Sequence, residues 1–249
     1  MFYVVSVTGE VPLYGLDGCP GGWVVACSSA ELASVTFSVI AERELKAFLR
    51  PLAGTAAVIA IDVPIGLADG DARACDRAAR VRLGAPRCSS VFSAPCRDSL
   101  AATDYLHACA INRALRGRAL SRQCWGIMTK IAVVEALLDE LPDLADQIWE
   151  VHPEVTFAEL AASPCGIGPR KKSPAGQRER LAVLAAHGLP VDLEHVRREL
   201  RAPEVARDDI VDAAGCLLTA ARIARQQAVF LPRGQPPLDR RGRRMQIAA

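Results

Sequence analysis

Hydrophobic and polar positions alternate along the first part of the chain, which predicts β-strands. The segment VTFSVIA places an apolar side chain at every second position, as in a strand with one buried face. Further along, AAVIAID is a continuous apolar run, typical of a strand that is covered on both faces. The pattern predicts strands at residues 13–17, 22–28, 34–41 and 56–62, with a helix at 42–52 before the last of them.

From residue 71 onward the apolar positions follow a helical period. Helices are predicted at residues 72–83, 99–115, 121–141, 173–187, 191–201 and 208–227, and one further strand at 147–155. The helices before this strand are too many for a simple crossover, so we predict a helical insertion at about 68–147, between the fourth and fifth strands. The expected fold class is α/β, with a mixed five-stranded sheet that is flanked by helices.

The predicted elements form one domain over residues 1–230. Residues 231–249 include PRGQPPLDRRGRR, and we expect them to form a basic, disordered tail. Whether the first dozen residues belong to the native protein is left open by the sequence.

The charge balance limits the kind of partner. Among 249 residues, 30 Lys and Arg stand against 28 Asp and Glu, so an anionic partner must meet a local patch and not a generally basic surface. The nine cysteines form no CxxC pair, which favours reduced thiols and a cytoplasmic location over a disulfide framework or a structural zinc site. No apolar window reaches the ~18 residues that a membrane span needs, so no membrane partner is expected.

Four aspartates stand at the ends of predicted elements, where side chains from separate segments can converge. Asp17 ends the first strand and Asp62 the fourth, while Asp209 and Asp212 share one face near the start of the last helix. Carboxylates held close together repel one another unless a metal ion or a proton neutralises them. We therefore predict that these four residues bind Mg²⁺ or Mn²⁺. Two ions about 3.5 to 4 Å apart would activate a water molecule and stabilise the leaving oxygen of a phosphodiester.

Each aspartate also has a purely structural interpretation. Asp17 beside Gly18 can cap a turn, Asp62 can simply end a strand, and Asp208 or Asp209 can be the N-cap of the last helix.

The segment WEVHPEV predicts another acidic position near the same site. Strand alternation would place Glu150, His152 and Glu154 on one face, and we count Glu150 among the candidate catalytic residues. His152 is a weaker candidate, because a lone histidine near acids is more often a structural residue.

Basic side chains gather in the predicted insertion. Arg73, Arg77 and Arg80 are spaced as on one face of a helix, and Arg97 and Lys130 follow in or next to loops. Because guanidinium groups match phosphate oxygens in a bidentate way, we predict that these five residues bind the substrate. The alternative is a solvent-exposed helix whose arginines pair with nearby aspartates.

The insertion also carries groups that suit a base or a sugar. The segments SSVF (89–92) and SRQCW (121–125) offer hydroxyls, an amide and aromatic rings. The sequence has no Walker loop, no GxGxxG between a strand and a helix, and no HExxH, so it lends no support to a nucleotide-cofactor or zinc-hydrolase interpretation.

A set of motifs follows in one order along the chain: GLDGCPGGWVVA, AIDVPIGL, RACDRAARVRLG, SSVFSAPCR, LSRQCWGIMTKI, EVHPEVTF and DDIVDAAG. As a set they resemble domain-of-unknown-function family 429, described as predicted nucleases of the RNase H fold, over roughly residues 14–230. The resemblance implies an RNase H-like fold. In it, Asp17 matches the first-strand acid, Asp62 the fourth-strand acid, and Asp209 with Asp212 the paired helix acids of RuvC-type resolvases.

Two further points concern how closely the chain follows the family. Glu150 lies in the family's EVHPE motif. The chain departs from the family pattern at Cys96 and at Met128-Thr129, where prolines are expected. Both departures lie in the insertion, so they affect contacts to the substrate and not the acids.

These observations predict a metal-dependent nuclease that hydrolyses phosphodiester bonds in nucleic acid, with basic residues positioning the phosphates. Two other classes stay open. One is a nucleotide-binding or phosphotransfer protein of the sugar-kinase and actin type, whose first strand also carries an acid before a Gly-rich hairpin. The other is a catalytically idle scaffold that binds a ligand in the acidic cleft. The sequence does not distinguish DNA, RNA or a small phosphoester as the substrate, and it gives no oligomeric state.

Overall fold

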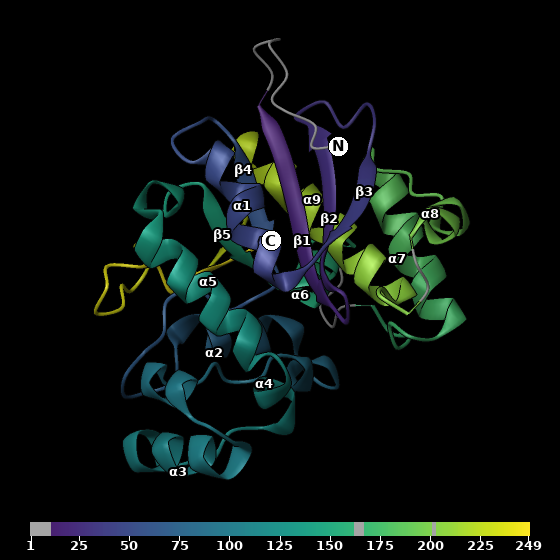
Figure 1. Ribbon diagram of the computed structural model, residues 1–249. Helices are drawn as coiled ribbons and strands as arrows, with labels where there is room; N and C mark the ends of the chain where they lie inside the picture. The colour runs from purple at the N-terminus through teal and green to yellow at the C-terminus, as the bar shows by residue number, and fades with distance from the viewer. Residues whose placement is uncertain (1–10, 162–166, 201–202) are drawn as a thin grey trace.

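A mixed β-sheet forms the centre of the protein in the computed structural model, which describes residues 11–161, 167–200 and 203–249 (Figure 1). In sheet order the strands are β3 (Thr36–Ile40), β2 (Gly22–Ser29), β1 (Pro12–Cys19), β4 (Val58–Ile61), β5 (Ile148–Val151), β7 (Ile247–Ala248) and β6 (Phe230–Leu231). β1, β2 and β3 form the predicted antiparallel meander, and β4, β5 and β7 continue the sheet in parallel from β1. Because β1 and β4 are parallel, their C-terminal ends meet at one edge of the sheet.

Nine α-helices accompany the sheet in the described ranges: α1 (Leu45–Leu49), α2 (Ala74–Leu83), α3 (Tyr105–Arg116), α4 (Arg122–Gly126), α5 (Met128–Glu140), α6 (Pro153–Leu160), α7 (Pro174–Ala186), α8 (Leu193–Glu199) and α9 (Arg207–Ala224). The predicted α/β class with a mixed sheet is therefore confirmed. In the same ranges, no helix is long and apolar enough to cross a membrane.

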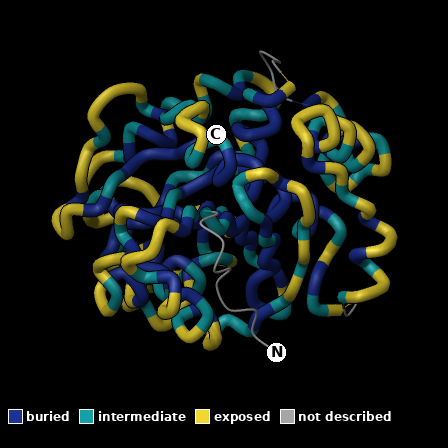
Figure 2. The backbone as a smooth tube through the Cα atoms, turned by 90° about the horizontal axis from the view of Figure 1, so that it is seen from above, coloured by how far each residue is buried: buried dark blue, intermediate teal, exposed yellow. Residues whose placement is uncertain are grey.

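Helices cover both faces of the sheet. α9 packs across β1, β2 and β4 with α6, α7 and α8 around it, and this face of the sheet includes Leu13 and Ala60. α1 and α5 cover the opposite face, on Leu16, Ile59 and Ile61. The buried backbone in Figure 2 lies between these layers, surrounded by more exposed loops and helices.

α9 lies directly on β1 because residue 15 is a glycine. A Cβ atom at Gly15 would collide with the carbonyl oxygen of Ala213 and the amide of Leu217. The missing side chain lets the helix backbone approach the strand closely. This contact brings the first turns of α9 over the end of β1.

The chain between β4 and β5 contains α2 to α5. In Figure 1, α2, α3 and α4 lie together beyond the sheet edge at which β1 ends, while α5 extends back toward the sheet. The strand predicted at 147–155 is shorter than expected. β5 ends at Val151 and α6 begins at Pro153, a residue that is favoured in the first turn of a helix.

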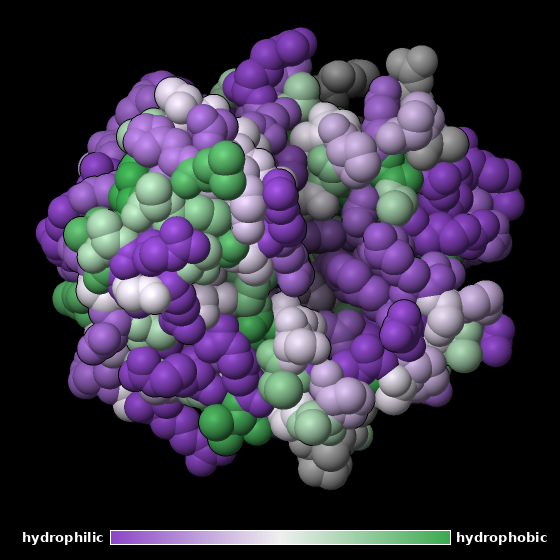
Figure 3. Space-filling model, turned by 90° about the horizontal axis from the view of Figure 1, so that it is seen from below, coloured by the Kyte–Doolittle hydropathy of each residue, from purple (hydrophilic) through white to green (hydrophobic). Residues whose placement is uncertain are grey.

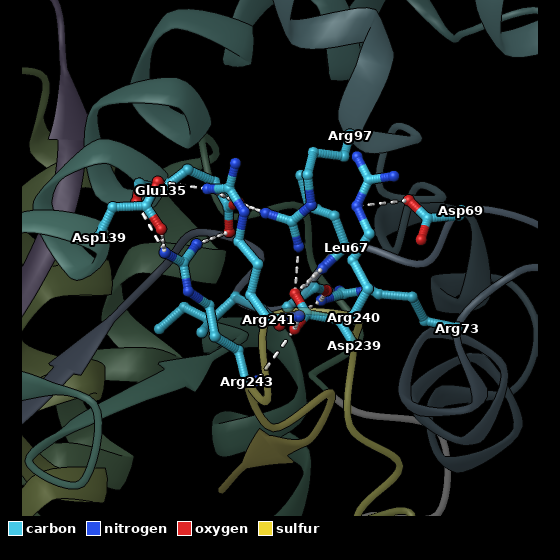
Figure 4. Close-up of polar contacts among 12 residues, drawn as sticks. Leu67, Asp69, Arg73, Arg97, Glu135, Asp139, Asp239, Arg240, Arg241 and Arg243 are labelled. Atoms are coloured by element: carbon cyan, nitrogen blue, oxygen red, sulfur yellow. Dashed lines mark hydrogen bonds and ion pairs between the residues drawn. The ribbon is translucent and has the colours of Figure 1, made fainter. Parts of the chain in front are cut away.

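The C-terminal segment 231–249 is not the disordered tail that the sequence predicts, because β7 and the end of β6 belong to it. With these two strands the sheet has seven strands in the described residues and not the predicted five. β7 pairs with β5, and Ile247, Ala248 and Ala249 are buried. Arg240, Arg241 and Arg243 of this segment pair with acids far away in the sequence. Arg243 pairs with Glu135 of α5 and with another acid of the same helix, as Figure 4 shows. The basic composition of the segment suggested disorder. The prediction was wrong because the acids that pair with these arginines lie elsewhere in the sequence.

Candidate active site

Asp17 and Asp62 are neighbours because of strand pairing and side-chain alternation. The Asp62 amide donates a hydrogen bond of 2.9 Å to the Leu16 carbonyl oxygen, which fixes the ends of β1 and β4 side by side. Alternation along the strands places Asp17 on the same face as Gly15, and Asp62 on the same face as Ala60. Both carboxylates therefore lie on the face that α9 covers.

The first two turns of α9 bring Asp209 and Asp212 to this sheet edge. Asp212 is 1% exposed, and its Oδ1 atom has no hydrogen-bond partner. Asp209 accepts a 2.9 Å hydrogen bond from the Ala206 amide through Oδ2, so it caps the helix start. The negative charges of the other three aspartates contribute to raising the pKa of Asp17.

A lysine lies among these aspartates. Lys171 Nζ is 2.6 Å from Asp212 Oδ2 and 3.7 Å from Asp208 Oδ2. We did not predict this contact. The sequence KKSP indicates only that Ser173 caps α7, and nothing in it places the preceding lysine over α9.

The protonation of the cluster follows from burial and from the neighbouring charges. Burial and the nearby carboxylates raise the pKa of Asp17 well above its ordinary value. Burial raises the pKa of Asp62 to about 6, although His152 and a hydrogen bond with Asp17 lower it. Burial also raises the pKa of Asp212, against the effect of Lys171. Without a metal ion, burial and the neighbouring carboxylates therefore favour the protonated form of Asp17.

Burial lowers the pKa of Lys171, but Asp212 and Asp17 outweigh this effect, so the pKa rises above its ordinary value. The ammonium group is therefore charged throughout the neutral range. The site contains a permanent cation that compensates part of its negative charge.

A cavity of about 200 Å³ separates the aspartates from the insertion. Its acidic side includes Asp17, Asp62 and Asp209 together with Lys171. The insertion contributes a second side that combines apolar and polar residues: Arg73, Asp76, Val91, Phe92, Gln123, Ile127 and Lys130. Figure 3 views the molecule from the side at which β1 ends, and the surface there is hollowed near its centre, with hydrophilic residues at the border.

Glu150 borders the same cavity as the aspartates, but both of its carboxylate oxygens are held by Arg73, which differs from its predicted place among the aspartates. Alternation along β5 places it on the face of Ile148, opposite to α9. Both of its carboxylate oxygens accept hydrogen bonds of 2.7 Å from Arg73, which also donates to Asp76 at 2.6 Å. Arg73, a predicted substrate ligand, is thus 2% exposed and joins the insertion to the sheet.

The same ion pair explains a possible metal site elsewhere in the structure. Cys75, Asp76 and Glu150 are the one group of three potential ligand residues within 4.8 Å of each other in the part of the chain that the structure describes. The Arg73 guanidinium already supplies the positive charge between these two carboxylates. Burial also raises the pKa of the Cys75 thiol, so it is protonated and a poor ligand. We interpret this group as a buried ion pair.

The three arginines at helical spacing have three different environments, which corrects the expected phosphate-binding face. α2 begins at Ala74, so Arg73 precedes the helix. Arg77 is exposed and donates to the backbone at the start of its own helix. Arg80 donates hydrogen bonds to the Val91 carbonyl oxygen at 2.8 Å and to Ser93 Oγ at 2.9 Å.

The other two predicted substrate ligands are also engaged within the protein. Lys130 lines the cavity, and its Nζ donates to the Gly22 carbonyl oxygen at 2.8 Å and to Glu42 at 3.1 Å. Its side chain passes over Gly18, where a Cβ atom would collide with it. The prediction that Arg97 binds the substrate differs most from the structure. Arg97 is buried in ion pairs with acids of α5 and of the C-terminal segment (Figure 4).

His152 of the EVHPE motif lines the cavity with the aspartates, as do Glu150 and Val151 before it. Its Nε2 atom is 3.4 Å from the Ser90 carbonyl oxygen, and its buried Nδ1 atom has no partner. The expected common face with Glu154 is wrong, since Glu154 belongs to α6 and pairs with Arg180 at 2.6 Å.

The Gly-rich turn between β1 and β2 is covered by the chain itself. The Gly21 amide donates a 2.8 Å hydrogen bond to the Glu204 carbonyl oxygen, and a Cβ atom at Gly21 would collide with the same residue. Because this amide is used internally, the turn does not support the sugar-kinase and actin alternative.

Comparisons with known proteins agree with the resemblance seen in the sequence. The family described as "Protein of unknown function (DUF429)" matches residues 15–236. Neither a curated protein nor a solved structure matches the chain. Because the family match covers most of the chain, this protein belongs to the DUF429 family of proteins of unknown function.

Proposed function

We propose that this protein is a divalent-cation-dependent hydrolase of phosphate diesters. The observation that carries the proposal is the unpartnered Oδ1 atom of Asp212, a carboxylate that is 1% exposed. Buried polar atoms are nearly always hydrogen-bonded, and an unpaired one costs about 1 to 3 kcal/mol or more when it is charged. Its neighbours Asp17 and Asp62 offer further carboxylate oxygens. A set of oxygen donors of this kind fits Mg²⁺ or Mn²⁺.

The strand order supports the fold that the resemblance implies. We propose that β3, β2, β1, β4 and β5 form an RNase H-like core with α9 across β1 and β4, and that β7 and β6 extend it. Fold alone does not establish an activity, so the proposed activity is argued from the side chains at the edge of this core.

We propose one bound ion and not the two that the sequence suggested. Asp17, Asp62 and Asp212 are its ligands in this proposal. Asp209 has one oxygen occupied as the cap of α9, and Lys171 already holds one oxygen of Asp212. No three of the described aspartates offer carboxylate oxygens that all lie within 4.8 Å of one another. In this proposal the Lys171 ammonium group supplies the positive charge that a second metal ion would otherwise provide.

Asp17, Asp62 and Asp212 would hold the divalent ion, which would supply a Lewis acid for the activation of water. Lys171 places a permanent positive charge beside it, where the charge on phosphate oxygens increases in the transition state. In the net reaction the water oxygen bonds to phosphorus, one phosphorus–oxygen ester bond breaks, and the released alcohol takes up a proton from the water.

Titration of the metal-free protein with Mn²⁺ by calorimetry tests this function. Wild type and Asp143→Asn, whose side chain is exposed on the surface, should both bind one ion and hydrolyse methyl p-nitrophenyl phosphate only when the ion is present. Asp212→Asn should bind Mn²⁺ at least about tenfold more weakly, because it removes a charged oxygen ligand. Failure of wild type to bind Mn²⁺ at millimolar concentration would contradict the proposal.

A further inference from the structure

The cavity beside the aspartates has two chemically different ends, and from them we infer the class of substrate. The geometry points to a phosphate diester that carries one unpaired base, and not to duplex nucleic acid. This inference rests on the proposed function, because it names the substrate of the same site.

The first end of the cavity is charged. Asp17, Asp62 and Lys171 line it, and Lys130 approaches it from α5. Lys130 Nζ uses two of its three donors on the Gly22 carbonyl oxygen and Glu42, which leaves one for a ligand. This end suits a phosphate group together with a cation.

The second end carries apolar and aromatic side chains next to the paired charges of Arg73 and Asp76. Val91, Phe92 and Ile127 line it, and the Gln123 side chain stands at the same wall. An aromatic ring offers a stacking surface for any base, and an amide can both donate to and accept from a base edge. A ligand that satisfies both ends has a phosphate on one side and a flat heterocycle on the other.

The wall that carries Phe92 is held in place from three sides. Arg80 donates to the Val91 carbonyl oxygen at 2.8 Å, and the Ala94 amide donates to Asp76 at 3.1 Å. His152 Nε2 is 3.4 Å from the Ser90 carbonyl oxygen, so the motif next to the acids also contacts this wall. Arg80, expected from the sequence to bind phosphate, therefore acts as a positioning residue for the aromatic side.

The volume limits what fits between the two ends. A cavity of about 200 Å³ lies below the ~300 Å³ at which pockets for drug-sized ligands begin. A space of this size matches one base, so we assign it to an unpaired base and not to a base pair.

Two esters with the same leaving group test this inference. Thymidine 5′-(p-nitrophenyl) phosphate and methyl p-nitrophenyl phosphate differ by the base and sugar, so kcat/KM should be at least about tenfold higher for the thymidine ester. Labelled single-stranded and duplex oligonucleotides form two further arms. Cleavage of the single strand identifies a polymer as the source of the unpaired nucleotide, and its resistance identifies a small nucleotide ester.

Equal kcat/KM for the two small esters, or cleavage of the duplex as fast as the single strand, would overturn the inference and leave the proposed function intact. If neither ester is hydrolysed in the presence of Mn²⁺, the proposed function itself fails.

Variants at Phe92 separate stacking from folding. Phe92→Leu should raise KM for the thymidine ester about tenfold with little change in kcat, and leave the methyl ester unaffected. Phe92→Tyr keeps the ring and should retain wild-type KM. Phe37→Leu alters a half-buried ring on β3, outside the cavity lining, and should change neither ester. Unchanged Mn²⁺ binding by each variant shows that the fold is preserved, and an unchanged KM in a folded Phe92→Leu would refute the role of the ring.

Discussion

Lys171 Nζ lies 2.6 Å from Asp212 Oδ2, so an ammonium group from the loop before α7 neutralises the most buried carboxylate of the site. The other oxygen of Asp212 has no partner. The ion pair thus satisfies one oxygen of this carboxylate and leaves the other without a protein partner. Since the Lys171 side chain is 38% exposed, the pair can exchange contacts with solvent and is not locked in the core.

Replacing Lys171 by alanine is expected to tighten Mn²⁺ binding by about tenfold, because the ammonium group no longer competes for the Asp212 oxygen. The metal-free protein should lose stability at pH 8, by only about 1 kcal/mol because the pair is partly exposed. Calorimetry and thermal unfolding in EDTA measure the two effects. Lys172→Ala is the matched control, since Lys172 is 78% exposed and 3.9 Å from Asp208. Weaker Mn²⁺ binding by Lys171→Ala would show that Lys171 supports the ion and does not compete with it.

The raised pKa of Asp62 predicts how the stability of the metal-free protein depends on pH. Burial raises this pKa from 3.8 to about 6, so between these values the folded state binds more protons than the unfolded state. The free energy of unfolding therefore falls as pH rises from about 4 to 6 and stays lower above. About two pKa units at ~1.4 kcal/mol each set an upper limit of about 3 kcal/mol.

Asp62→Asn removes this titration and should be more stable than wild type at pH 8 in EDTA, by up to about 3 kcal/mol. The difference in stability should become small near pH 3.5, where the Asp62 carboxyl is mostly protonated in both the folded and the unfolded state. Urea unfolding at several pH values measures it, with Asp143→Asn as a control that changes nothing. Saturating Mn²⁺ should reverse the order, because ligand binding stabilises only the folded state that retains the site. A metal-free Asp62→Asn that is less stable than wild type at pH 8 would refute the assigned pKa shift.

The positions of the aspartates could be predicted because they depend on local rules. Asp17 and Asp62 directly follow buried apolar runs, and parallel strands end at one edge of a sheet. The acids of α9 share a face because of helical spacing. These patterns need no knowledge of distant contacts, so the sequence alone sufficed.

The partners of the charged residues could not be predicted in this way. Helical spacing suggested a shared face for Arg73 and Arg80, but α2 begins after Arg73, and the exact helix start is not visible in the sequence. Glu150 was placed with the aspartates because it is an acid on a strand, yet the register of β5 turns it to the opposite face. Lys171 reaches the site through a loop, and the position of a loop depends on the whole fold.

Arg73→Ala should destabilise the protein by about 3 to 5 kcal/mol, because it leaves the buried carboxylates of Glu150 and Asp76 without their counterion. Arg77→Ala, on the same helix but exposed, should change stability by no more than about 0.5 kcal/mol. Urea unfolding compares the two. A stable Arg73→Ala protein with weakened substrate binding would restore the phosphate-binding role that the sequence suggested.

The C-terminal segment offers a test of whether it belongs to the fold. Ile247 is 1% exposed in β7, between β5 and β6, so Ile247→Ala should cost about 2 to 5 kcal/mol of unfolding free energy through lost burial and the cavity left behind. Arg233→Ala changes an exposed residue of the same segment and should have little effect. A disordered basic tail would give the opposite pattern, since an apolar side chain in solvent contributes nothing to stability. Urea unfolding of both variants, with hydrogen exchange at the Ile247 amide, therefore distinguishes a strand of the sheet from a tail.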